Sequence, residues 1–301
     1  MHGADRVGVR EIAGLLMSRT SPTENPRRHI DAHHLLGGLD VDAGNLLGAR
    51  LHFGEALTIA RSTADKVHEA IQLHNMGNLQ RLLGNYILAS SLLRDGLNMS
   101  LELELKKVAV HVICLLARID IDVGNASASL PDIERGFVLA QSLRNNDIHA
   151  SLLIVIAQAK LALGLINCAE ASFQNAAALV DGSHHSHEQV EALCGLATIA
   201  VTRGDHSQAL AHVGLISAKV ANVGAAEQME ANLVCYETLM QTGAEFEAVG
   251  HLKRAKDILD KMQRPLSAMF RAVPRNRTIL DEWGKFRASV MHGTAIRGPV
   301  G

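Results

Sequence analysis

Three polar side chains at helical spacing lie between residues 75 and 81. Asn75, Asn78 and Arg81 are each three residues apart, so a helix places them on one face. Asparagine can both donate hydrogen bonds to an extended peptide backbone and accept them from it, and arginine can bind a carboxylate through two parallel bonds. The spacing predicts a site for a peptide that carries an acidic group, and a solvated helix face is the alternative.

A second group of ligating side chains is the run His184-His185-Ser186-His187-Glu188. Imidazole nitrogens and carboxylates are ligands of zinc and other transition metals. Histidine-rich exposed connections are commoner than metal sites, whose ligands are usually fixed by the fold. We therefore predict no metal and no cofactor, and metal binding by His184, His185 and His187 stays an open question.

The sequence has neither a phosphate-binding glycine loop nor a nucleophile elbow, two common marks of catalytic centres. The cysteines are spaced by 54, 26 and 41 residues, which matches no zinc or redox motif: Cys114, Cys168, Cys194 and Cys235. We expect a protein that is not an enzyme. Its thiols should be reduced, which favours the cytoplasm, with the nucleus as the alternative.

The charge of the chain is balanced overall and uneven locally. Its formal net charge of −2 gives no general attraction to nucleic acid or to an anionic membrane. No apolar run reaches the about 20 residues that a bilayer span needs. Between residues 264 and 301, however, seven basic residues stand against two acidic ones. We expect no direct nucleic-acid or membrane partner, and a solvated basic tail.

Glycines at a fixed interval indicate the elements that must position these side chains. They are separated by 40, 40, 40, 40 and 39 residues: Gly44, Gly84, Gly124, Gly164, Gly204 and Gly243. Glycine adopts the positive φ that ends many helices without steric cost. The period therefore predicts six copies of one helix-turn-helix unit.

The unit itself resembles the tetratricopeptide repeat (TPR). The copy around residue 84 has Leu73, Met76-Gly77, Gly84 and Ala89 at the offsets of that repeat, and the match covers most of the chain. Small residues at these offsets let two helices approach closely. The resemblance implies an all-α fold, a right-handed solenoid (superhelix) of six TPR helix pairs with helical end segments.

Two subgroups of the family share further features with this chain. The triplet Leu83-Gly84-Asn85 and the extended 40-residue period resemble the Leu-Gly-Asn subgroup, whose members are mostly signalling adaptors. They resemble equally the TPR arms of signal-transduction ATPases found in transcription regulators and receptors. The period does not separate the two.

The repeat pattern divides the chain into three parts. Residues 1–29 are expected to form an N-terminal helix and linker, residues 30–263 the six repeats, and residues 264–301 a C-terminal capping helix and basic tail. The capping helix is expected over about residues 278 to 291, starting with a capping box at Thr278 and Asp281. Ile279, Trp283 and Phe286 should form its buried face, and residues 292–301 should be disordered.

The resemblance also implies that the first helix of each pair lines a concave groove. The residues that it assigns to the partner-binding groove are His74, Asn75, Asn78, Arg81, His111, Arg118 and Gln158. Further along, the same positions are acidic, as at Glu191 and Glu230. Ile154 and Leu233 are expected to add apolar contact. The lysines of chaperone-tail cofactors are absent, so that role is not expected.

We expect a protein-protein interaction scaffold, or adaptor, that binds a peptide or partner-protein segment in the concave groove. The alternative is a ligand- or peptide-sensing arm of a larger signalling or transcription regulator, which an ATPase or DNA-binding segment in the same reading frame before Met1 would favour. A scaffold that acts through the convex face is a third hypothesis. The sequence indicates neither the partner nor the oligomeric state.

Overall fold

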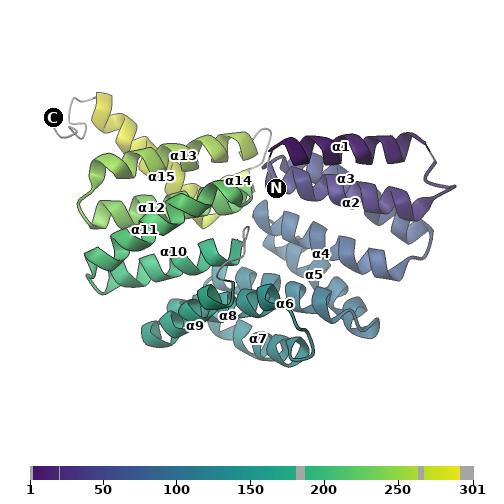
Figure 1. The fold of residues 1–301 in the computed structure, drawn as a ribbon, viewed down its shortest axis with the longest axis horizontal. Coiled ribbons are helices and arrows are strands. Elements are labelled where there is room, and N and C mark those ends of the chain that lie inside the picture. Colours follow the sequence, from purple (N-terminus) through teal and green to yellow (C-terminus); the bar gives the residue numbers. More distant parts are fainter. Residues whose placement is uncertain (1–2, 20, 181–186, 264–267, 292–301) are drawn as a thin grey trace.

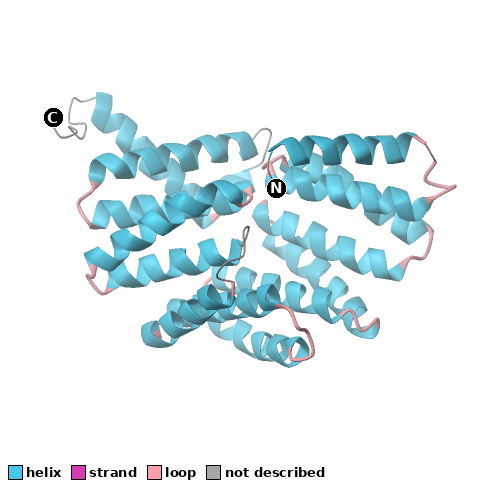
Figure 2. Cartoon of the chain, in the orientation of Figure 1, coloured by secondary structure: helices cyan, strands magenta, loops and turns pink. Residues whose placement is uncertain are grey.

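The structure is a computed structural model that describes residues 3–19, 21–180, 187–263 and 268–291. Within these ranges the chain is helical, with connecting turns and no strand (Figure 2). The helices are α1 (Gly3–Ser18), α2 (Pro26–Asp42), α3 (Leu46–Ser62), α4 (Lys66–Leu82), α5 (Tyr86–Glu102), α6 (Lys106–Asp122), α7 (Ala126–Ala140), α8 (Asn146–Ala162), α9 (Ile166–Leu179), α10 (His187–Thr202), α11 (His206–Lys219), the 3-10 helix η1 (Val220–Asn222), α12 (Ala225–Gln241), α13 (Glu245–Gln263), α14 (Ala268–Ala272) and α15 (Pro274–Met291).

Six helix pairs form the body of the molecule. They run from α2 with α3 to α12 with α13, and each pair packs on the next (Figure 1). Helix α1 lies on the first pair, and α14 and α15 follow the last one. The predicted all-α superhelix of six helix pairs with helical end segments is confirmed.

The turn inside every pair is built on the glycine that the period predicted. All six glycines have φ between 73° and 81°. In the first two pairs the next residue, Asn45 or Asn85, caps the second helix, because its side chain accepts a hydrogen bond from the backbone N–H three residues later. The Leu-Gly-Asn triplet thus ends one helix and begins the next.

Two connections between pairs place other residues in the same left-handed region, Ala64 at φ 55° and Glu104 at φ 56°. Replacing Ala64 by glycine should raise the free energy of unfolding by roughly 0.5–1 kcal/mol, because removing the strained Cβ outweighs the added freedom of the unfolded chain. Ala43, at φ −84°, is the control. Urea unfolding measures both variants, and an equal gain in Ala43→Gly would contradict this explanation.

Small residues on the first helices let the paired helices approach, as the repeat pattern requires. A Cβ built on Gly37 would lie 2.4 Å from Phe53 Cε1, and one built on Gly77 would lie 2.6 Å from Leu93 Cγ. Both distances are shorter than any carbon-carbon contact, so a larger residue there forces the helices apart. The packing role expected of Gly77 follows directly from this contact.

The superhelix curves until its last pair meets the first turn and α14, which follows that pair, meets the second turn (Figure 1). A Cβ built on Gly44 would lie 2.9 Å from Met262 Cγ and 3.1 Å from Ala225 Cβ. One built on Gly84 would lie 2.7 Å from the carbonyl oxygen of Met269. One hydrophobic cluster also runs through α3, α4, α12 and α13. We call the contact of these two turns with Ala225, Met262 and Met269 the seam.

Helix α15 covers the last pair. Ile279 is fully buried, and Trp283 and Phe286 pack on the same core cluster, as expected. The hydroxyl of Tyr236 donates a hydrogen bond to Glu282 Oε2 on α15 at 2.7 Å. A tyrosine stands in α12 at a position where other repeats have a small residue, because its neighbour is this capping helix and not another repeat.

The capping box predicted at Thr278 is wrong. Helix α15 begins at Pro274, and the Thr278 hydroxyl donates to the Pro274 carbonyl inside the first turn. The division at residues 29/30 and 263/264 stays a prediction, and residues 292–301 lie outside the described residues. Among the described helices, none is both long and apolar enough to cross a membrane.

Candidate functional site

The concave side of the superhelix holds a cavity with two lobes. The polar lobe has a volume of about 230 Å³ and is lined by Arg81, Leu82, Arg118, Ile121, Asp122, Gln158, Glu191, Ala226, Glu227, Glu230 and Arg275. The apolar lobe has about 160 Å³ and is lined by Gln158, Leu161, Phe173, Val190, Glu191, Cys194, Gly195, Thr198, Glu227, Glu230, Ala231 and Val234. Four residues belong to both lobes, so we treat them as one central cavity: Gln158, Glu191, Glu227 and Glu230.

The repeat period explains why side chains from distant parts of the sequence converge here. Arg118, Gln158 and Thr198 are 40 residues apart and occupy the same position on α6, α8 and α10. Equivalent residues of a superhelix line one face, because each repeat stacks on the last with a similar rotation. Arg275, in contrast, comes from α15 and lies outside the repeats.

The cations of the polar lobe are arranged in ion pairs. Arg118 donates from Nη1 and Nη2 to the two carboxylate oxygens of Glu191, at 2.7 and 2.8 Å. Arg275 Nη1 lies 3.2 Å from Glu230 Oε2, and Arg81 Nη1 lies 3.7 Å from Asp122 Oδ2. Each guanidinium therefore has one carboxylate partner, and only the pair of Arg118 with Glu191 is bidentate.

The pair of Arg118 with Glu191 is largely shielded from water, its side chains being 16% and 15% exposed. Burial alone would raise the pKa of the Glu191 carboxyl, but the charge and hydrogen bonds of Arg118 lower it below the ordinary value. Burial likewise opposes the charge of Arg118, and Glu191 raises its pKa. Both groups are charged at neutral pH.

Glu227 is the fourth carboxylate in the lining of the polar lobe. Among the ion pairs of the described residues, none includes it. Burial raises its pKa; its own backbone N–H and the nearby His187 lower it, and the carboxylates of Glu191 and Glu230 raise it, so the net shift is upward. The cavity thus holds a carboxylate that has no ion-pair partner among the described residues.

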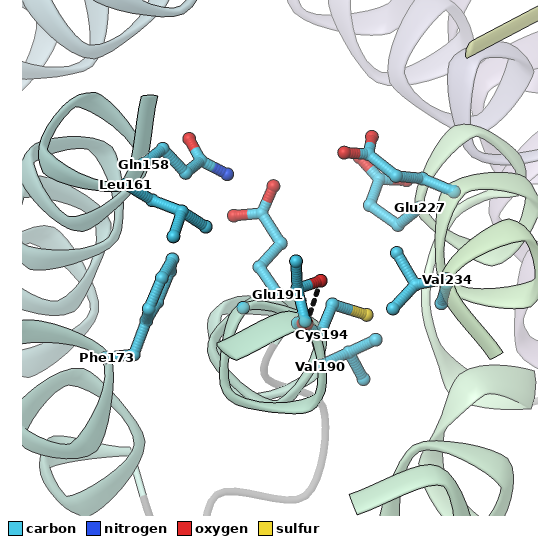
Figure 3. Close-up of a pocket in the computed structure, with 12 residues that line it drawn as sticks. Gln158, Leu161, Phe173, Val190, Glu191, Cys194, Glu227 and Val234 are labelled. Atoms are coloured by element: carbon cyan, nitrogen blue, oxygen red, sulfur yellow. Dashed lines mark hydrogen bonds between the residues drawn. The ribbon is translucent and has the colours of Figure 1, made fainter. Parts of the chain in front are cut away.

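The apolar lobe is built from α8, α9, α10 and α12. Figure 3 shows Leu161 and Phe173 on one side and Val234 on the other, with Glu191 rising between Gln158 and Glu227. Burial raises the pKa of the Cys194 thiol well above its usual value, so the sulfur is a neutral wall atom. The lobe is an apolar binding pocket directly beside the carboxylates of Glu191, Glu227 and Glu230.

Of the seven residues predicted for the groove, three line the central cavity, three lie in a separate polar cluster, and Asn78 belongs to neither set. Arg81, Arg118 and Gln158 line the central cavity. Asn78 accepts a hydrogen bond from Arg81 Nη2 at 3.4 Å but is not part of the lining. The alternative of a solvated helix face does not hold for Arg81, whose side chain is only 11% exposed.

His74, Asn75 and His111 lie in a separate polar cluster with Gln72 and His34. The Asn75 amide donates to Gln72 Oε1 at 3.1 Å and contacts His34 Nδ1 at 2.9 Å, so it already has partners. Burial and the neighbouring His111 lower the pKa of His74 to about 4. These rings are neutral at physiological pH. Whether any of the seven residues contacts a partner stays a prediction.

Sequence reasoning missed the remaining wall of the cavity. Glu227 and Arg275 were not among the candidates, and the two apolar residues that were expected in the groove are in the core: Ile154 is 0% exposed and Leu233 is 6% exposed. A signal for Glu227 existed in its place three residues before Glu230, a recognised acidic position. No repeat position pointed to Arg275.

The histidine run contributes no described metal site. His184 and His185 lie outside the described residues, and His187 Nε2 lies 3.2 Å from Glu188 Oε1. The part of the chain that the structure describes holds no group of three or more residues suited to a metal ion.

Comparisons with known proteins bear on the fold. No family model matches the chain, and no curated protein matches it. The structure is similar to a Rap protein complexed with competence and sporulation factor, with a TM-score of 0.64, 14% identity, and coverage of 94% of this chain and 80% of that chain. It is also similar to BtubC (BKLC) from P. vanneervenii, with a TM-score of 0.54, 17% identity, and coverage of 71% and 87%.

The fold is a tetratricopeptide-like helical repeat. At these identities the two solved structures show the fold of this chain. Its function must be inferred from its own residues. The Leu-Gly-Asn adaptor subgroup and the arms of ATPase regulators both stay predictions for this tetratricopeptide-like chain.

Proposed function

We propose that this tetratricopeptide-like protein is a non-catalytic scaffold that binds a segment of a peptide or partner protein in the central cavity. The observation that carries the proposal is the convergence of α4, α6, α8, α10, α12 and α15 on one two-lobed cavity. The similar Rap protein, whose structure is a complex with competence and sporulation factor, supports the use of this fold for binding.

The size of the cavity defines how much of a partner it can hold. The apolar lobe, at about 160 Å³, is close to the roughly 150 Å³ apolar cavity that binds benzene. It therefore seats one side chain, and the polar lobe of about 230 Å³ seats a second group. The rest of the partner lies outside, which differs from an extended peptide held along a whole groove.

The polar side chains act differently from the backbone clamp that the sequence suggested. The Asn75 amide is satisfied by Gln72 and His34, and Arg118 is neutralised by Glu191. Arg81 Nε and Arg275 Nε are buried and have no hydrogen-bond partner among the described residues. Both arginines line the polar lobe, and the N–H groups that their guanidiniums present to it can donate to neutral acceptors such as peptide carbonyl oxygens.

Filling the apolar lobe should abolish binding. Peptides are selected from an unbiased random display library on the full chain, and their affinities are measured by fluorescence polarisation. The indole of Val234→Trp fills the lobe, so this variant should bind the selected peptides roughly tenfold or more weakly. A tenfold loss of affinity corresponds to about 1.4 kcal/mol of binding free energy.

The matched control is Ile87→Trp, because Ile87 is 89% exposed outside the cavity. It should leave affinity unchanged. Unchanged binding by a folded Val234→Trp variant, or loss of binding in Ile87→Trp alone, would contradict the proposal and favour a convex-face scaffold. Circular dichroism confirms that both variants keep their helices.

The seam supports a second candidate function, a ligand-sensing arm of a larger regulator. Arg81 and Leu82 lie on one side of the seam, and Glu227, Glu230 and Arg275 lie on the other, yet all five line the polar lobe. A ligand that contacts both sides stabilises the closed ring through differential affinity. Peptide-dependent protection of the seam from proteolysis would favour this function over a passive scaffold.

A further inference from the structure

We propose that the segment bound in the central cavity carries a cationic group next to an apolar side chain, and that Glu227 binds the cation. This inference rests on the proposed function and specifies its ligand. An ammonium or guanidinium lies against Glu227 in the polar lobe, while the apolar side chain enters the lobe formed by Leu161, Phe173 and Val234.

The charges of the polar lobe carry the inference. The lobe contains three guanidiniums and four carboxylates. The guanidiniums of Arg118, Arg275 and Arg81 are each assigned to one carboxylate, namely Glu191, Glu230 and Asp122. Glu227 is left over. A partly buried carboxylate without an ion-pair partner is unfavourable, so a ligand that supplies the cation is preferred over a neutral one.

An acidic ligand group, which the sequence suggested, fits the same lobe less well. Burial lowers the pKa of Arg81, and the neighbouring guanidiniums of Arg275 and Arg118 lower it further, so the three cations do repel one another. Their charges are nevertheless already compensated, and an incoming carboxylate would lie among Glu191, Glu227 and Glu230. The like charges of these three carboxylates disfavour an anionic ligand group in the same lobe.

Glu227 also belongs to both lobes, which sets the order of groups in the ligand. Its neighbours in the shared lining are Gln158, Glu191 and Glu230. Figure 3 places Glu227 near Val234 and across from Gln158. A cation bound here is therefore directly beside the apolar lobe, so the two ligand groups are adjacent along its chain.

A structural role for Glu227 is the competing explanation. It lies in the first turn of α12, where a carboxylate stabilises the helix dipole, and its Oε2 would lie 2.6 Å from a Cβ on Gly224. His187 on α10 also favours its charge. A glutamine keeps the shape and the capping capacity of the side chain, and removes only the charge. Glu227→Gln therefore separates the two roles.

The test uses the peptides selected on the full wild-type chain. They should be enriched in lysine or arginine next to a leucine, phenylalanine or similar residue. Replacing that cationic residue by glutamine should weaken binding to wild type by at least about tenfold, and should change binding to Glu227→Gln little. Selection on Glu227→Lys should lose the lysine and arginine enrichment.

Two controls define the origin of the effect. Glu237 lies on α12 outside the cavity lining, and Glu237→Gln should bind the peptides like wild type. The selected peptides are also synthesised with free and with acetylated N-termini. Equal affinity assigns the cation to the side chain, whereas a loss on acetylation assigns it to the α-amino group, and both support an ammonium or guanidinium at Glu227.

Thermal unfolding of the free protein gives an independent readout. The pKa of Glu227 is raised in the folded state, so its ionised form destabilises the fold at neutral pH. Glu227→Gln should therefore raise the melting temperature by roughly 2–4 °C. A lower melting temperature would mean that the carboxylate caps α12, and would overturn the inference.

The two proposals fail differently. If no peptide is selected, or if Val234→Trp binds every selected peptide as tightly as wild type, the proposed function fails. If peptides bind in a manner that depends on Val234 but show no cationic preference, or if Glu227→Gln binds them unchanged, the function stands and the cationic ligand is wrong.

Discussion

Replacing Arg118 by alanine should lower the free energy of unfolding by about 3–5 kcal/mol. The substitution leaves Glu191, 15% exposed, without the guanidinium that donates two hydrogen bonds to it at 2.7 and 2.8 Å. An uncompensated carboxylate in this site costs far more than an exposed ion pair contributes. Urea unfolding followed by circular dichroism measures the change.

The double variant Arg118→Met, Glu191→Leu is the control for this prediction. It removes both charges and keeps apolar volume, so it should recover most of the loss. If Arg118→Ala costs under about 1 kcal/mol, water reaches the pair and its burial has no energetic consequence.

The pH dependence of the same pair has a defined sign. Arg118 lowers the pKa of Glu191 in the folded state below its unfolded value. The stability that the pair contributes is therefore present above the unfolded pKa of a glutamate, and it is lost as the pH falls through the lower folded value. Arg118→Ala should flatten the acid limb of the stability curve.

Replacing Gly84 by alanine should open the seam and lower the free energy of unfolding by about 2–4 kcal/mol. Two costs combine at this residue. Its φ of 78° disfavours any side chain, and the new Cβ would lie 2.7 Å from the Met269 carbonyl oxygen and 2.8 Å from Val273 Cγ2. Small-angle scattering should show a larger radius of gyration.

Gly124 provides the matched control for the seam. Its φ is 79°, nearly the same as that of Gly84, but a Cβ there meets no atom within 4 Å. Gly124→Ala should therefore cost only the backbone term of about 1–2 kcal/mol and leave the radius of gyration unchanged. Equal effects of the two substitutions would show that the seam adds nothing to the backbone cost.

An open seam also has a consequence for binding. The polar lobe is lined from both sides of it, by Arg81 on α4 and by Glu227 and Arg275 on α12 and α15. Gly84→Ala should lower the affinity for peptides selected on the wild-type chain, because part of the binding free energy is then used to close the seam. Gly124→Ala should bind them normally.

The sequence by itself determined the repeat and its local geometry. The 40-residue spacing of the turn glycines, the capping asparagines Asn45 and Asn85, and the small residue Gly77 all act within one helix pair or between neighbouring pairs. Contacts of this range follow from residue type and offset alone, because each repeat touches mainly its neighbours. These features could be predicted, and they place Arg118 and Gln158 on the concave side.

Only the tertiary structure decided the shape of the concave side and the ion pairs on it. The closure of the seam depends on small rotations that accumulate over six repeats, and a period in the sequence does not specify their sum. The curvature of the superhelix brings Arg118 on α6 to Glu191 on α10, 73 residues away, and α15 brings Arg275 from outside the repeats to Glu230. Glu227, in the lining that the two lobes share, is left without an ion-pair partner among the described residues. A pattern of residue types predicts which side chains face inward, but which of them remain unpaired is decided by the distances between them.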